Sequence, residues 1–109
     1  MNSETALFNA CSSGNESIVK YLVEHGADIN KENYYGETPL FNACESGNEI
    51  IVKYLIENEA DVNSKNKIGE IPLSLTYEKE NKALVKCLVK HGADINKGGR
   101  EGETPLIIA

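Results

Sequence analysis

The apolar residues of this chain recur in short segments with the spacing of an amphipathic helix. The clearest segment places four apolar residues at positions i, i+1, i+4 and i+5, on one side of a helix: Ile51, Val52, Leu55 and Ile56. Charged residues at i, i+4 and i+8 mark the opposite, solvated side: Glu49, Lys53 and Glu57. This pattern predicts a helix over about residues 49–58.

Turn and capping residues predict a shorter helix immediately before it. Gly36 is suited to a tight turn, Thr38 offers a hydroxyl as N-cap, and Pro39 stands at the first helical position, where a missing N–H costs nothing. Gly47 is placed to end this helix in a left-handed conformation. The first helix of the unit is therefore expected over about residues 39–45.

The same pattern returns every 33 residues without a gap. Leucine recurs in register at four positions: Leu7, Leu40, Leu73 and Leu106. Residues 3–33 and 36–66 share 21 identities in 31 positions. A fixed period of this length is the signature of a repeat architecture. We predict an all-α solenoid of stacked helix-turn-helix units.

The chain is predicted to form one repeat domain over residues 1–109. Its units span about 3–35, 36–68 and 69–101, followed by a partial unit over 102–109. Because the partial unit stops before a second helix, we expect the chain to be a piece of a longer array.

The second unit carries the motifs that recur through the chain: Gly36-Glu37-Thr38-Pro39-Leu40, Gly47, Ile51-Val52, Leu55-Ile56 and Ala60-Asp61-Val62-Asn63. This set resembles the ankyrin repeat over essentially the whole chain. The resemblance implies an L-shaped stack of helix pairs with hairpin-like loops at right angles, a concave face formed by loops and first helices, no catalytic machinery and no cofactor. The family usually has His after Thr-Pro-Leu, whereas this chain has other residues there: Phe8, Phe41, Ser74 and Ile107.

Charge and composition exclude several classes of partner. Eleven Lys and Arg against 17 Asp and Glu give a net charge of −6, which repels nucleic acid. No segment approaches the roughly 20 apolar residues of a membrane-spanning helix. Three cysteines in a chain of this length favour reduced thiols over a disulfide scaffold. We expect a monomeric protein of the cytoplasm or nucleus, with no nucleic-acid or membrane partner.

The residues that could carry chemistry are better explained by structure. His25 and His91 occupy equivalent positions one before a glycine, which suits the end of a helix and places them too far apart to share a metal ion. Cys11 and Cys44 stand at equivalent small-residue positions, and Cys87 takes the place of a tyrosine in the second helix. We expect buried, unreactive thiols, no metal site and no enzymatic activity.

Two adjacent tyrosines, Tyr34 and Tyr35, stand where the other units have different residues, and we expect either a binding anchor or a ring packed on the next loop. Glutamates recur just before each first helix, which indicates an acidic face for a partner with a basic or mixed surface, or a stripe that only solvates the fold. The residues predicted to bind a partner are Tyr34, Tyr35, Glu37, Glu45, Ser46, Ile68 and Glu70.

The third unit departs from the other two at positions that affect stability. Ile71 replaces the capping Thr38, Glu80 replaces the helix-ending Gly47, and Tyr77 replaces a small residue. A lost cap and a left-handed glutamate each cost about 1 kcal/mol, so local opening is expected to start in this unit.

Two functions are consistent with these observations. The first is a protein-binding module that uses the loop tips and first helices. The second is a spacer within a longer solenoid, which the near identity of the first two units favours. The family resemblance also makes Asn30, Asn63 and Asn96 similar to substrates of an asparaginyl hydroxylase. The alternative is that each of these asparagines, and the aspartate two residues before it, holds its own loop by side-chain to backbone hydrogen bonds.

Overall fold

The computed structural model describes residues 3–93 of the chain. These residues form six helices and no strand: α1 (Ser3–Ser13), α2 (Glu16–Glu24), α3 (Pro39–Ser46), α4 (Glu49–Glu57), α5 (Pro72–Glu78) and α6 (Lys82–Lys90). The all-α prediction is confirmed, and the helices predicted over 39–45 and 49–58 are observed as α3 and α4. The partial fourth unit and Asn96 lie outside the described residues.

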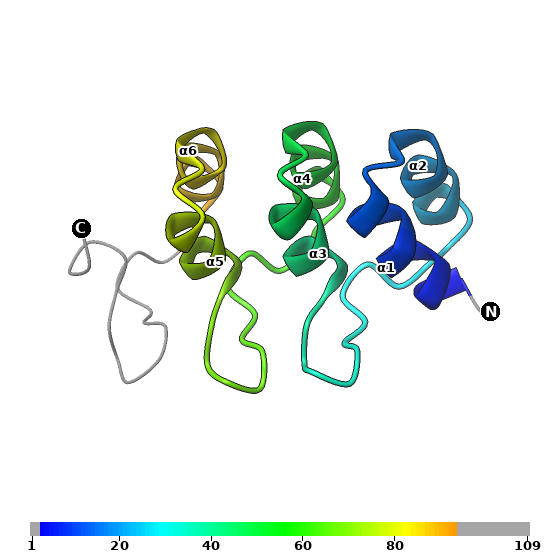
Figure 1. The fold of residues 1–109 in the computed structure, drawn as a ribbon. Coiled ribbons are helices and arrows are strands. Elements are labelled where there is room, and N and C mark those ends of the chain that lie inside the picture. The colour runs from blue at the N-terminus through cyan, green and yellow to red at the C-terminus, as the bar shows by residue number, and fades with distance from the viewer. Residues whose placement is uncertain (1–2, 94–109) are drawn as a thin grey trace.

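The helices form three antiparallel pairs stacked side by side (Figure 1). The first helices, α1, α3 and α5, make one row, and the second helices, α2, α4 and α6, make another. The loops after α2 and α4 project away from both rows, which produces the L-shaped section that the family resemblance implies.

The core lies between the two rows and between successive pairs. Equivalent leucines of the first helices, Leu7, Leu40 and Leu73, are all buried. Phe41, at the position where the family usually has His, is buried as well, so apolar packing takes the place of a polar side chain. In the first unit Ala6 stands where the other units have proline, and α1 accordingly begins before that position instead of at it.

Asparagine residues cap the second helix of each of the three described helix pairs. The side-chain Oδ1 atoms of Asn15, Asn48 and Asn81 accept hydrogen bonds from the backbone N–H three residues later, at 3.0–3.2 Å. Each bond satisfies one of the N–H groups that a helix leaves unpaired at its start. These caps recur at the 33-residue period, but they were not predicted from the sequence.

Thr38 lies at the N-cap position of α3, but its side chain makes no capping hydrogen bond. Its Oγ1 atom is buried without a partner among the described residues. Ile71 occupies the equivalent position before α5 with the same extended backbone, and it is fully buried. The expected loss of a cap in the third unit is therefore wrong, because isoleucine replaces a hydroxyl that caps nothing.

The predicted ends of the first helices are confirmed. Gly47 ends α3 with φ 78°, and Gly14 has φ 77° at the equivalent position after α1. Glu80 keeps the left-handed backbone after α5, with φ 56°. A side chain with a Cβ atom is disfavoured in this conformation. The backbone strain predicted in the third unit is therefore present at Glu80.

Asn30 joins the first unit to the second. Its Oδ1 atom accepts the N–H of Asp61 at 2.8 Å, and its Nδ2 atom donates to the carbonyl of Glu59 at 3.1 Å. Asn63 Nδ2 donates to the carbonyl of Gly92 at 3.1 Å in the same way. The expectation that these asparagine side chains hold their own loops is wrong, since they bridge to the next unit. The aspartate part is right: Asp28 Oδ1 accepts the N–H of Asn30.

We predict opposite effects for two substitutions at helix starts. Thr38→Val should leave the free energy of unfolding unchanged or raise it by up to about 1 kcal/mol, because it removes a buried hydroxyl that has no partner. Asn48→Ala should lower it by about 1 kcal/mol, because it removes a cap. Urea unfolding followed by circular dichroism measures both free energies. If Thr38→Val were destabilised, the conclusion that the Thr38 hydroxyl caps nothing would be wrong.

We also predict that Glu80→Gly stabilises the chain by about 0.5–1 kcal/mol. Glycine removes the left-handed strain, and part of the gain is offset by the greater freedom of glycine in the unfolded chain. The control is Glu80→Gln, which removes the charge but keeps the Cβ atom. Equal stability of the two variants would show that charge and not backbone strain decides the effect.

Candidate protein-interaction surface

The loop between α2 and α3 is held in a hairpin shape by Asn33. The backbone N–H of Asn33 donates to the carbonyl of Glu37 at 2.8 Å. Asn33 Oδ1 accepts the N–H groups of Tyr35 and Glu37 at 2.9 and 3.0 Å, and Nδ2 donates to Glu37 Oε1 at 3.2 Å. One asparagine side chain therefore fixes the backbone of the loop tip.

The loop between α4 and α5 repeats this arrangement around Asn66. Asn66 Oδ1 accepts the N–H groups of Ile68 and Glu70 at 3.1 and 2.9 Å, and Nδ2 donates to Glu70 Oε1 at 3.2 Å. Asn33 and Asn66 were not predicted from the sequence, although they recur one period apart. Glu37 and Glu70 were predicted to bind a partner, but both are half-buried and their carboxylates hold these loops.

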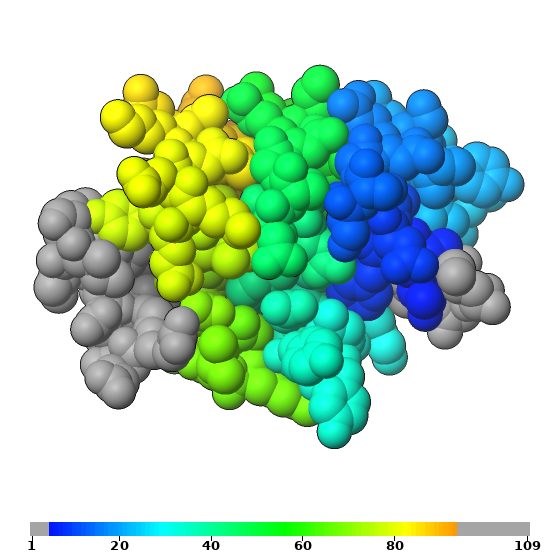
Figure 2. Space-filling model, viewed as in Figure 1, coloured from blue at the N-terminus to red at the C-terminus, as the bar shows by residue number. Residues whose placement is uncertain are grey.

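The two hairpin tips are joined to each other. The backbone N–H of Lys67 donates to the carbonyl of Tyr35 at 3.0 Å. Gly36 makes this approach possible: a Cβ atom there would lie 3.0 Å from the Lys67 backbone nitrogen, and its φ is +77°. The space-filling view shows the neighbouring loops packed side by side (Figure 2). The tips therefore present one continuous surface.

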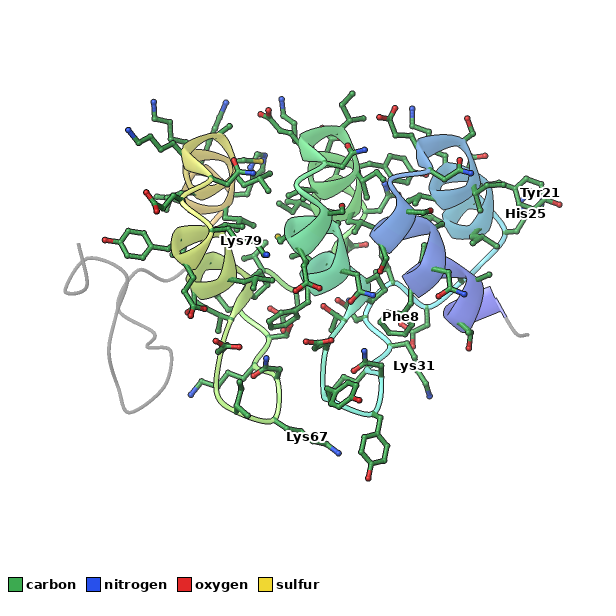
Figure 3. The ribbon with its side chains drawn as sticks, in the orientation of Figure 1. Phe8, Tyr21, His25, Lys31, Lys67 and Lys79 are labelled. Carbon is green, nitrogen blue, oxygen red and sulfur yellow. The ribbon has the colours of Figure 1, made fainter. Side chains whose placement is uncertain are left out.

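Three apolar side chains stand out from this surface. Tyr34 is 82% exposed, Tyr35 is 67% exposed and Ile68 is 57% exposed. The two tyrosine rings pack edge to face, with centroids 5.7 Å apart. Lys67 reaches from its loop toward the neighbouring one (Figure 3), and its Nζ atom lies 4.7 Å from the centroid of the Tyr34 ring. Both rings are therefore largely exposed, and the Tyr34 ring also contacts Lys67 of the next loop, so the contact that was the alternative to an anchor is present at Tyr34.

Glu45 and Ser46 lie apart from the loop tips. Both are exposed, but they lie in the last turn of α3, whereas the loop joins its first turn. At 1.5 Å per residue, the length of α3 separates them by about 10 Å along the helix. The Oγ atom of Ser46 donates to the carbonyl of Ala43 at 2.9 Å. The structure thus brings Tyr34, Tyr35 and Ile68 together and leaves Glu45 and Ser46 on the helix face.

The cysteines are buried, as predicted, and none forms a disulfide. Burial raises the pKa of the Cys11 thiol to about 12 and raises the pKa of the Cys44 and Cys87 thiols as well. A raised thiol pKa leaves little thiolate, which is the nucleophilic form.

The two histidines are found at helix ends, as predicted. His25 and His91 are the C-cap residues of α2 and α6, and each hydrogen-bonds through Nδ1 to a backbone carbonyl at 2.7 Å. Within residues 3–93, no three side chains of the metal-ligating types come together.

The geometry defines a helical repeat protein that displays paired hairpin tips. The family model of ankyrin repeats, built on three copies, matches residues 1–66, which is more than half of the chain. The chain therefore belongs to the ankyrin-repeat family. A search of curated protein sequences finds no match.

Membership of this family indicates a general role. Ankyrin repeats generally mediate protein-protein binding, and the family is typically non-enzymatic. The third helix pair lies beyond the matched residues, yet it has the same asparagine cap as the first two. None of the helices in the described part of the chain is long and apolar enough to cross a membrane.

We predict that the thiols react slowly while the chain is folded. At pH 8, a pKa of about 12 in place of 9.0 lowers the thiolate fraction of Cys11 about 1000-fold. Modification of Cys11 by an aromatic disulfide reagent should therefore be at least about 100-fold slower in the native protein than in guanidinium, with glutathione as the reference thiol. Cys87, which lines a surface groove, should react first by peptide mapping, and a fast native reaction of Cys11 would contradict burial.

Proposed function

We propose that the chain is a non-enzymatic module that binds a protein partner through its loop tips and the adjoining face of the first helices. The observation that carries this proposal is the exposure of Tyr34, Tyr35 and Ile68 on two loops joined by a backbone hydrogen bond. Tyrosine supplies a large contact area and loses little side-chain entropy on binding, which suits it to an anchor.

The hydrogen bonds within the loops support this role. Asn33 and Asn66 fix each tip before any partner arrives. Binding then does not have to order the loop backbone, and the free energy of association is reduced less by lost conformational entropy. A rigid surface with protruding side chains is the arrangement expected for specific recognition.

The net charge of the chain and the charges of the proposed surface suggest the character of the partner. The chain as a whole has a net charge of −6, and Glu45 is exposed on α3. Lys67 adds a positive charge beside the Tyr34 ring. We therefore propose that the partner is a protein with a basic or mixed surface and not a nucleic acid. The chain binds it as a monomer. We place this binding in the cytoplasm or nucleus, where the three thiols of the chain stay reduced.

The test compares Tyr34→Ser/Tyr35→Ser with Tyr21→Ser. Tyr21 is also exposed, at 58%, but it lies on the outer side of α2, away from the loop tips (Figure 3). The immobilised proteins are incubated with lysate from the cells that express the chain, and retained proteins are identified by mass spectrometry. We expect a protein that binds the wild type and Tyr21→Ser, and whose affinity for the double variant falls at least about tenfold.

A second comparison tests the charge of the helix face. Glu45→Lys reverses an exposed charge without breaking a loop hydrogen bond, unlike a change at Glu37 or Glu70. It should weaken binding of a basic partner and leave the fold intact by circular dichroism. If no retained protein distinguishes the tyrosine variants, the loop tips are not the binding surface and the spacer role in a longer solenoid is favoured.

A further inference from the structure

The second helices of the last two units enclose a groove. It has a volume of about 430 Å³ and is lined mainly by Glu49 and Lys53 of α4, by Lys86, Cys87 and Lys90 of α6, and by the C-cap residue His91. This size falls within the roughly 300–1,000 Å³ of pockets that hold small ligands. The second helices lie at the opposite end of the molecule from the loop tips, so the groove is separate from the proposed partner-binding surface (Figure 1).

A tyrosine occupies the same register one unit earlier. Tyr54 of α4 is half-buried beside α2, and Lys20 of α2 holds its Nζ atom 5.8 Å from the centroid of that ring. Cys87 stands 33 residues after Tyr54, and Lys53 stands 33 residues after Lys20. The change from tyrosine to cysteine therefore removes a ring from beside a lysine and leaves space at the junction of α4 and α6.

The charges of the third unit change at the same place. In α2 and α4, a lysine lies between two glutamates at i, i+4 and i+8, as in Glu49, Lys53 and Glu57. In α6 all three positions are lysine: Lys82, Lys86 and Lys90. The groove is lined by three lysines and one glutamate, and Glu57 also acts electrostatically on Cys87, so lysines outnumber glutamates there by one in a chain whose net charge is negative.

We propose that this groove is a second binding site, which takes an aromatic side chain flanked by carboxylates from a partner protein. The ring fills the space that a tyrosine fills in the preceding unit and lies against Lys53 as Tyr54 lies against Lys20. The flanking carboxylates pair with Lys86 and Lys90. The imidazole of His91, fixed by its hydrogen bond to the Cys87 carbonyl, forms part of the groove wall.

The test is a titration of the isotope-labelled chain with synthetic peptides, followed by amide chemical shifts. The first peptide has one tyrosine between two pairs of aspartates, the second replaces tyrosine with alanine, and the third replaces aspartate with lysine. We expect saturable shifts around Cys87 and Lys53 for the first peptide, with a Kd of about 1 mM or below. The other two peptides should bind at least tenfold more weakly.

Three variants distinguish binding in this groove from binding elsewhere on the chain. Cys87→Tyr should abolish binding because its ring fills the groove as Tyr54 does one unit earlier. Lys90→Glu, which restores the charge found at Glu24 and Glu57, should weaken binding at least tenfold and changes only an exposed residue. The double variant Tyr34→Ser/Tyr35→Ser should bind the acidic peptide as tightly as the wild type does. The groove can therefore be tested independently of the proposed binding at the loop tips.

The proposal is overturned if the acidic aromatic peptide gives no saturable shifts. It is also overturned if shifts occur only at the loop tips, if Lys90→Glu binds as tightly as the wild type, or if the basic peptide binds equally well. A parallel titration with 4-hydroxyphenylacetate tests the source of the ring. If this small acid binds more tightly than the peptide, the claim that the groove binds a segment of a protein is overturned.

Discussion

The structure depends on burial between successive helix pairs, because no pair can cover its own apolar surface. The effect is visible at two equivalent isoleucines. Ile51 of α4, in the second pair, is part of the core cluster and is 1% exposed, whereas Ile18 of α2, in the first pair, is 43% exposed. The side chain is the same and its helix is equivalent, and only the neighbouring unit differs. Stability in such an array is a sum over units and their interfaces.

The sequence predicted the repeat, the all-α fold and the bounds of α3 and α4 well, because these follow from a strict period and from glycine and proline. The predictions from the sequence were wrong where a polar side chain had several possible hydrogen-bond partners. Thr38 has the residue type of a cap, but its hydroxyl is buried without a partner among the described residues. Asn30 bonds to the next unit instead of its own loop. The choice made by Asn30 depends on atoms 29 and 31 residues away in the chain.

The candidate site was predicted in part for the same reason. Variation between near-identical units singled out Tyr34, Tyr35 and Ile68, and the structure places them together. The pattern of recurring glutamates suggested a charged binding stripe, yet Glu37 and Glu70 hold the loops. The sequence indicated only that Cys87 packs in place of a tyrosine. That its smaller side chain leaves a groove follows from the packing of α4 against α6 in the structure.

In each hairpin, the residues that hold the backbone differ from the residues whose side chains are exposed, and this separation affects how such a surface evolves. The backbone of each tip is set by Asn33, Gly36 and Glu37, or by their counterparts one unit later, while the side chains at positions 34, 35 and 68 point outward. Mutations at the outward positions alter what the surface recognises without disturbing the frame that carries it. The tips can therefore diversify rapidly after a duplication, while the frame residues keep the two copies in register.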